Sequence, residues 1–159
     1  MPTATYSTLI HADFDDIWGM LLDKVQQPQK WMPGVERVEL SEVGASNPSS
    51  NSEKWERCVW FQDGSLVRER ITIDEANRAI VVEPLNDQRY TGYVSTVLLR
   101  CPVAGHALGA HVLVRTLDFR AKRRLTDEEI AQGEVMASKV KESILALKYE
   151  AESHEEGGG

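Results

Sequence analysis

The chain has 159 residues, 42% of them hydrophobic and 27% charged, which supplies enough apolar material for one buried core and excludes a disordered protein. Its formal net charge of −7 argues against a nucleic-acid partner, because phosphate backbones are bound by clustered Lys and Arg. No apolar run reaches the roughly 18 residues of a membrane-spanning helix, so no membrane insertion is expected.

The N-terminal segment predicts one strand followed by two short helices. A β-prone run at 6–11 leads into a helix that Asp13 can cap and that Pro28 stops. A short second segment at 29–32 precedes a Pro-Gly turn. The apolar residues of the first helix fall on one stripe, as expected for a helix that packs on a core: Phe14, Ile17, Trp18, Leu21 and Leu22.

The middle of the chain alternates apolar and polar residues with the period of two that indicates β-strands. A polar linker at 44–53 interrupts this pattern, and the Asp63-Gly64 pair between two of the runs predicts a hairpin. The strands are expected at 35–40, 54–61, 66–73, 79–83, 91–100 and 111–120.

The last predicted element is a long helix from Asp127 to about Ala151, roughly 37 Å in length at 1.5 Å per residue. Thr126 and Glu129 form a capping box at its start. One face holds the residues expected to pack on the sheet: Gly133, Met136, Ala137, Val140, Ile144 and Leu147. Residues 153–159 are polar and end in glycines, so they are expected to form a flexible tail.

Strands placed between helices predict an α+β fold, with a curved seven-stranded antiparallel sheet around the C-terminal helix in one domain at 1–152. A sheet of this size seldom fills its interior against a single helix. We therefore expect a ligand cavity between the two.

This order of elements, with Trp18 and the Trp-Met-Pro-Gly turn at 31–34, resembles the SRPBCC superfamily, also called START or Bet v 1-like. Within it the chain looks most like the AtaL-like (DUF1857) group, through residues 55–61, the turn at 63–64 and residues 67–71. The resemblance implies a helix-grip fold with an internal cavity. It does not imply one chemistry, because the superfamily includes lipid and hormone carriers, polyketide cyclases and aromatases, and other enzymes of natural-product synthesis.

Arg57 and Glu69 are the first candidates for catalysis, because each is the single charge on an otherwise apolar strand face. If these faces line the cavity, Glu69 can act as a general acid or base and Arg57 can hold a carboxylate or enolate oxygen. The alternative is a cross-strand ion pair on the outer face of the sheet. His111 is a further candidate for proton transfer, with a partly exposed, non-catalytic histidine as its alternative.

The ligand is expected to contact the inward strand faces and the final helix. Gly133 and Ala137 are small, so they leave room near the start of that helix. Together the expected ligand-binding residues are Trp55, Val59, Phe61, Ile71, Tyr93, Ser95, Leu113, Arg115, Gly133, Met136, Ala137 and Val140.

Two functions fit these features. The first is a cofactor-independent cyclase, dehydratase or isomerase acting on a polyketide-like metabolite of secondary metabolism. The second is a carrier that binds a small hydrophobic molecule without converting it. Either function has a small, largely apolar molecule as its partner.

Metals, cofactors and secretion have no signal in the sequence. No Cys and His residues have zinc-ligand spacing and no glycine-rich nucleotide loop is present, so neither a metal nor a cofactor is expected. Cys58 and Cys101 are far apart and are expected to be reduced thiols. With no signal peptide at the N-terminus, a cytoplasmic protein is expected.

Overall fold

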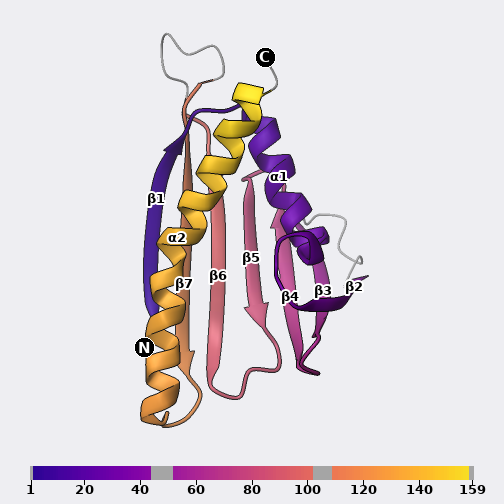
Figure 1. Ribbon diagram of the computed structural model, residues 1–159, viewed down its shortest axis with the longest axis vertical. Coiled ribbons are helices and arrows are strands. Elements are labelled where there is room, and N and C mark those ends of the chain that lie inside the picture. Colours follow the sequence, from indigo (N-terminus) through magenta and orange to yellow (C-terminus); the bar gives the residue numbers. More distant parts are fainter. Residues whose placement is uncertain (1, 44–51, 102–108, 158–159) are drawn as a thin grey trace.

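The computed structural model describes residues 2–43, 52–101 and 109–157 of the chain. Within these ranges the elements follow the predicted order (Figure 1). They are β1 (Thr3–Ile10), α1 (Phe14–Gln26), the 3-10 helix η1 (Pro28–Lys30), β2 (Val35–Glu42), β3 (Ser52–Phe61), β4 (Leu66–Asp74), β5 (Ala79–Pro84), β6 (Tyr90–Leu99), β7 (His111–Ala121) and α2 (Asp127–Gly157). Most of the predicted linker at 44–53 lies outside the described residues.

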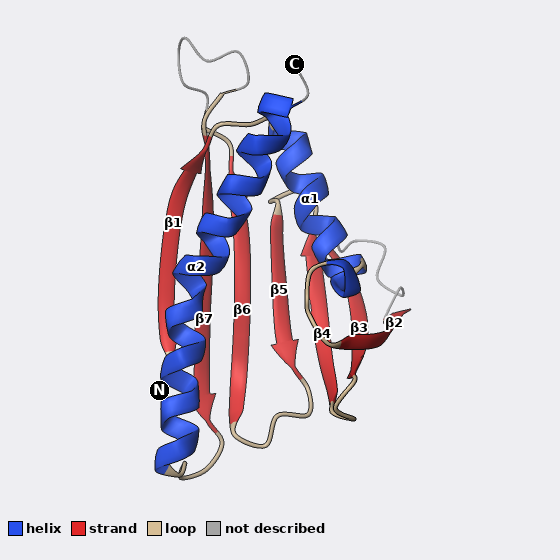
Figure 2. Cartoon of the chain, viewed as in Figure 1, coloured by secondary structure: helices blue, strands red, loops and turns tan. Residues whose placement is uncertain are grey.

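The seven strands form one antiparallel sheet in the order β1-β7-β6-β5-β4-β3-β2. Both helices cover the same face of this sheet, α2 across β1 and β7, and α1 on the side of β4 and β5 (Figures 1 and 2). The C-terminal end of α2 lies beside the start of α1, and the helices diverge from there (Figure 2). The predicted α+β helix-grip architecture is therefore confirmed.

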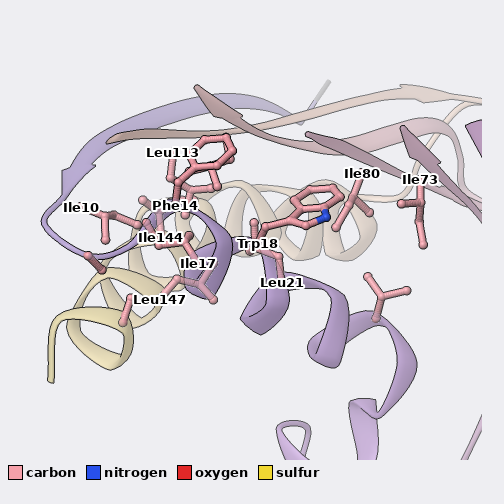
Figure 3. Packing of buried hydrophobic residues seen from close by; sticks show 14 of the residues in the cluster. Ile10, Phe14, Ile17, Trp18, Leu21, Ile73, Ile80, Leu113, Ile144 and Leu147 are labelled. Carbon is pink, nitrogen blue, oxygen red and sulfur yellow. The ribbon is translucent and has the colours of Figure 1, made fainter. Parts of the chain in front are cut away.

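The main core lies where the two helices and the sheet meet. Asp13 caps α1 as predicted, because its carboxylate accepts the backbone N–H of Asp16 at 3.0 Å. From this start, α1 directs its apolar stripe onto the sheet and onto α2 (Figure 3). The buried residues labelled there are Ile10, Phe14, Ile17, Trp18, Leu21, Ile73, Ile80, Leu113, Ile144 and Leu147.

The capping box of α2 is also confirmed. The Thr126 N–H donates to the Glu129 carboxylate at 3.0 Å, and the Glu129 N–H donates to the Thr126 hydroxyl at 3.2 Å. Arg123 donates to both carboxylate oxygens and thereby lowers the pKa of Glu129 to about 2. The predicted end near Ala151 is wrong, since the helical backbone continues to Gly157. Among the described residues, neither helix has the length and apolar character needed to cross a membrane.

The predicted hairpin forms between β3 and β4. Asp63 accepts the Ser65 N–H at 2.8 Å, and Gly64 has φ of +88°, a conformation that glycine adopts without steric cost. This turn sets the register that places Arg57 directly opposite Glu69.

Candidate functional site

A cavity of about 380 Å³ lies between the diverging helices and the sheet, a size in the range of ligand sites. Trp31 and Met32, in the turn after η1, form part of its wall and are each 41% exposed. Most of the remaining wall is apolar and comes from Leu21 and Val25 of α1, Ile80, Val82 and Val94 of the sheet, and Leu147 of α2. The polar side chains that reach the cavity are Lys24, Arg57, Thr96, Arg115 and Ser143.

A second hollow, of about 620 Å³, lies between α1 and the C-terminal part of α2 and shares Trp31 with the cavity. Its acidic residues include Asp15 and Asp16, which are exposed. We place the candidate site in the smaller cavity, because the buried Arg57 and the half-buried Lys24 and Arg115 gather there, and charged groups withdrawn from water are typical of functional sites.

Arg57 is held on two sides. Its Nε and Nη2 donate to the same oxygen of Glu69, at 3.1 and 2.8 Å, and its Nη1 donates to the backbone carbonyl of Val25 at 3.0 Å. Val25 lies in the last turn of α1, where carbonyls have no partner within the helix and favour a cation. Arg57 therefore joins the β3–β4 hairpin to the end of α1.

Glu69 lies across the hairpin from Arg57, as the sequence predicted, but its side chain is not part of the cavity wall. One of its oxygens accepts both Arg57 bonds, and its side chain is 18% exposed. The two residues thus form a largely buried ion pair in which only the cation reaches the cavity.

Arg115 is held differently, because both of its partners are neutral. Its Nε donates to the Thr96 hydroxyl at 3.0 Å and its Nη1 donates to the Ser143 hydroxyl, also at 3.0 Å. Burial lowers the pKa of the Arg115 guanidinium from its usual value, although arginine remains protonated at neutral pH. No carboxylate among the described residues forms an ion pair with it. Arg115 is therefore a half-buried cation that has no carboxylate partner among the described residues.

Lys24 is the third cation of the cavity wall, and it does have a counterion. Its Nζ lies 3.1 Å from a carboxylate oxygen of Glu150 on α2 and 3.4 Å from the centre of the Trp31 ring. These contacts join both helices and the turn after η1 at one point.

The partly exposed position predicted for His111 is wrong, and its role in proton transfer stays a prediction. His111 is 3% exposed, its ring packs edge-on against Phe14 at 5.0 Å, and its Nδ1 accepts the Cys101 N–H at 3.2 Å. It is not part of the cavity wall, so the structure gives it a packing position at the start of β7.

The room expected beside Gly133 is filled by Tyr90. A Cβ added to Gly133 would lie 2.5 Å from the Tyr90 hydroxyl, which donates to the Glu129 carbonyl at 3.1 Å. Tyr90 also stacks on Phe119 at 5.9 Å. The first turns of α2 therefore close over a packed cluster, and the cavity lies farther along the helix, beside Ser143, Ala146 and Leu147.

Of the predicted site residues, only Arg57 and Arg115 are among those that line the cavity. On β6, Val94 and Thr96 line the cavity. Tyr93 and Ser95 alternate with them along the strand, so they lie on the opposite face of the sheet. Ile71, Leu113 and Val140 belong to the packed core clusters, and Trp55 and Met136 pack against those clusters. Val59 is also buried, whereas Phe61 and Ala137 are half-buried positions elsewhere on β3 and α2.

The sequence reasoning missed Lys24 and Ser143, and of the hydroxyl-bearing residues on β6 it selected Tyr93 and Ser95 in place of Thr96. Thr96 is adjacent to Ser95, and the choice between them depends on which strand face turns inward. The spacing of Ser143 and Ala146 could have predicted which part of α2 faces the cavity, because two small residues three positions apart leave space beside one face of a helix.

Comparison with known proteins gives similarity in structure only. No family model and no curated protein matches the chain. An 18 kDa protein from Caulobacter crescentus matches with a TM-score of 0.61 and 14% identity, over 98% of this chain and 99% of that one. A START superfamily protein from Mycobacterium smegmatis matches with a TM-score of 0.57 and 12% identity, over 95% and 97% of the two chains.

The ZhuI aromatase/cyclase from Streptomyces sp. R1128 matches with a TM-score of 0.56 and 19% identity, over 94% of this chain and 93% of that one. At these identities the matches establish the fold. The chain therefore has the helix-grip fold, which it shares with proteins described as START superfamily members and as aromatase/cyclases.

Proposed function

We propose that the protein binds a small, largely apolar, polyketide-like metabolite in the 380 Å³ cavity and acts on it without a cofactor, as a cyclase or dehydratase. The observation that carries this proposal is Arg115, a half-buried guanidinium on the wall of a largely apolar cavity, with no carboxylate partner among the described residues. The similar fold of an aromatase/cyclase supports it.

A fixed cation in an apolar cavity favours reactions that develop negative charge on oxygen. In a molecule with alternating carbonyl and methylene groups, loss of a methylene proton gives an enolate, which a guanidinium stabilises more strongly in the cavity than in water. Thr96 and Ser143 already hold the Arg115 side chain, so little reorganisation is needed when the charge appears.

Ring closure then requires that two parts of the substrate meet. The enolate carbon attacks a second carbonyl carbon of the same molecule, a C–C bond forms, and the resulting alkoxide takes up a proton in place of the one removed. Cavity walls that hold the substrate in a folded conformation bring its two reacting carbons together and so lower the entropic part of the activation barrier. In a dehydratase, the new hydroxyl group then leaves as water together with a neighbouring proton.

Glu69 is a positioning residue in this proposal, and not the general base. Its carboxylate is bound to Arg57, and the described residues that line the cavity include no carboxylate or imidazole. The proton therefore passes to water, which restricts the reaction to substrates whose methylene groups are already acidic, such as 1,3-dicarbonyl compounds. The same lack of a base also fits the carrier function, which remains the second candidate.

A 1,3-diketone with an apolar body, 1-(2-naphthyl)butane-1,3-dione, tests this proposal. We expect the protein to bind it and to accelerate deuterium exchange at the central methylene, measured by NMR, at least tenfold over buffer. The Arg115→Met protein is expected to lose the acceleration. Arg120→Met is the matched control, because Arg120 is an exposed arginine of the same strand.

The results separate the two candidate functions. Binding without faster exchange would reject the enzyme and support a carrier. No binding of the diketone to the wild-type protein, by fluorescence titration, would reject both functions.

A further inference from the structure

The described residues of the cavity wall carry more positive charges than there are carboxylates paired with them. Three cations of the described part of the chain line the cavity: Lys24, Arg57 and Arg115. Two carboxylates pair with them, Glu150 with Lys24 at 3.1 Å and Glu69 with Arg57 at 2.8 Å. Among the described residues, one positive charge remains uncompensated, and it belongs to Arg115.

From this inequality we infer that the ligand enters the cavity as an apolar monoanion and that its negative group binds Arg115. The inference rests on the proposed function, since it names the substrate class of the same cavity. The matching chemistry is a pair of oxygens that share one negative charge, as in a carboxylate or in the enolate of a 1,3-dicarbonyl compound.

The hydrogen bonds of Arg115 support a ligand whose negative group has two oxygens. Arginine has five N–H donors, and Thr96 and Ser143 accept one each. Three donors therefore have no acceptor among the described residues. A guanidinium with free donors binds two oxygens through parallel hydrogen bonds, which is the geometry that arginine makes with carboxylates.

The energetics explain why a neutral ligand is the poorer fit. A half-buried charge without a counterion destabilises the folded protein, because the part of its hydration that is lost is not replaced. An anion restores that interaction, whereas a neutral molecule of the same shape leaves the cation uncompensated. Charge on the ligand should therefore govern affinity at this site.

The inference is tested with two fluorescent probes of one shape, 2-naphthoate and its neutral analogue 2-naphthamide. At pH 7 the wild-type protein is expected to bind the naphthoate at least tenfold more tightly. The Arg115→Met protein should bind the two probes with about equal affinity, and its affinity for the naphthamide should stay within a few-fold of wild type. Arg120→Met should keep the wild-type preference.

Thermal unfolding without ligand gives a readout that a merely structural arginine would not produce. Removing the uncompensated charge is expected to raise the Tm of Arg115→Met by about 2–4 °C, the shift that roughly 1 kcal/mol produces in a domain of this size. A lowered Tm would show that Arg115 stabilises the fold and would overturn the inference.

The remaining outcomes separate this inference from the proposed function. If the wild-type protein binds both probes equally, or prefers the naphthamide, the anionic substrate class is wrong while the cavity remains a binding site. If neither probe nor the naphthyl diketone binds, the proposed function is wrong as well. The affinity for the naphthoate is then compared with the affinity for the diketone, whose binding is monitored through the absorbance of its enolate. The tighter ligand identifies which paired-oxygen group the site prefers.

Discussion

Replacing Glu69 by glutamine is expected to destabilise the protein strongly and to leave the chemistry of the cavity in place. The substitution removes the counterion of Arg57, a side chain that is itself buried. Breaking a buried ion pair by removing one partner costs about 3–5 kcal/mol, and the partial exposure of Glu69 reduces this to about 2–4 kcal/mol. Urea unfolding measures the loss directly.

A second pair on the same hairpin provides the control. Glu56 pairs with Arg68 across the same two strands, and the Arg68 side chain is 48% exposed. Glu56→Gln is therefore expected to change the free energy of unfolding by no more than about 1 kcal/mol. An equal loss in the two variants would mean that burial does not distinguish the pairs.

The exchange reaction decides the role of Glu69. If it positions Arg57, Glu69→Gln should still accelerate deuterium exchange of the diketone at temperatures where the variant is folded. Loss of exchange with unchanged diketone binding would instead establish Glu69 as the general base. The double variant Arg57→Met/Glu69→Leu should recover much of the lost stability, because it buries no unpaired charge.

The fold could be predicted from the sequence because its signals are local. The capping box at Thr126, the Asp63-Gly64 turn and the strand alternation each depend on residues close together in the chain, and the structure bears them out. The hairpin register then placed Arg57 opposite Glu69. The Val25 carbonyl that completes the Arg57 site could not be predicted, because its position depends on where α1 ends above the sheet.

The position of the cavity could not be predicted for a related reason. A small residue on a helix indicates space beside it, but the sequence does not say which side chain from another element occupies that space. At Gly133 it is Tyr90 of β6, whereas beside Ser143 and Ala146 part of the space remains open. Tertiary packing across the sheet, and not helix periodicity, makes this difference.

That packing leads to a second strong effect, at Gly133. An alanine in the middle of a helix usually stabilises it by up to about 1 kcal/mol relative to glycine. At Gly133 we expect the opposite, a loss of about 1–3 kcal/mol, because the added methyl group would lie 2.5 Å from the Tyr90 hydroxyl and must displace it or the helix. The hydrogen bond from Tyr90 to the Glu129 carbonyl would be strained in either case.

Two further variants show whether the tyrosine hydroxyl is the cause. Gly19 lies in α1 with no atom within 4 Å of an added Cβ, so Gly19→Ala should stabilise the protein by about 0.5–1 kcal/mol. In a Tyr90→Phe background the nearest ring carbon to the new Cβ lies at 3.4 Å, an ordinary contact, so Gly133→Ala should become neutral or stabilising there. If Gly133→Ala destabilises both backgrounds equally, the Tyr90 hydroxyl does not exclude the methyl group. Glycine at this position would then be required for the approach of α2 to the sheet.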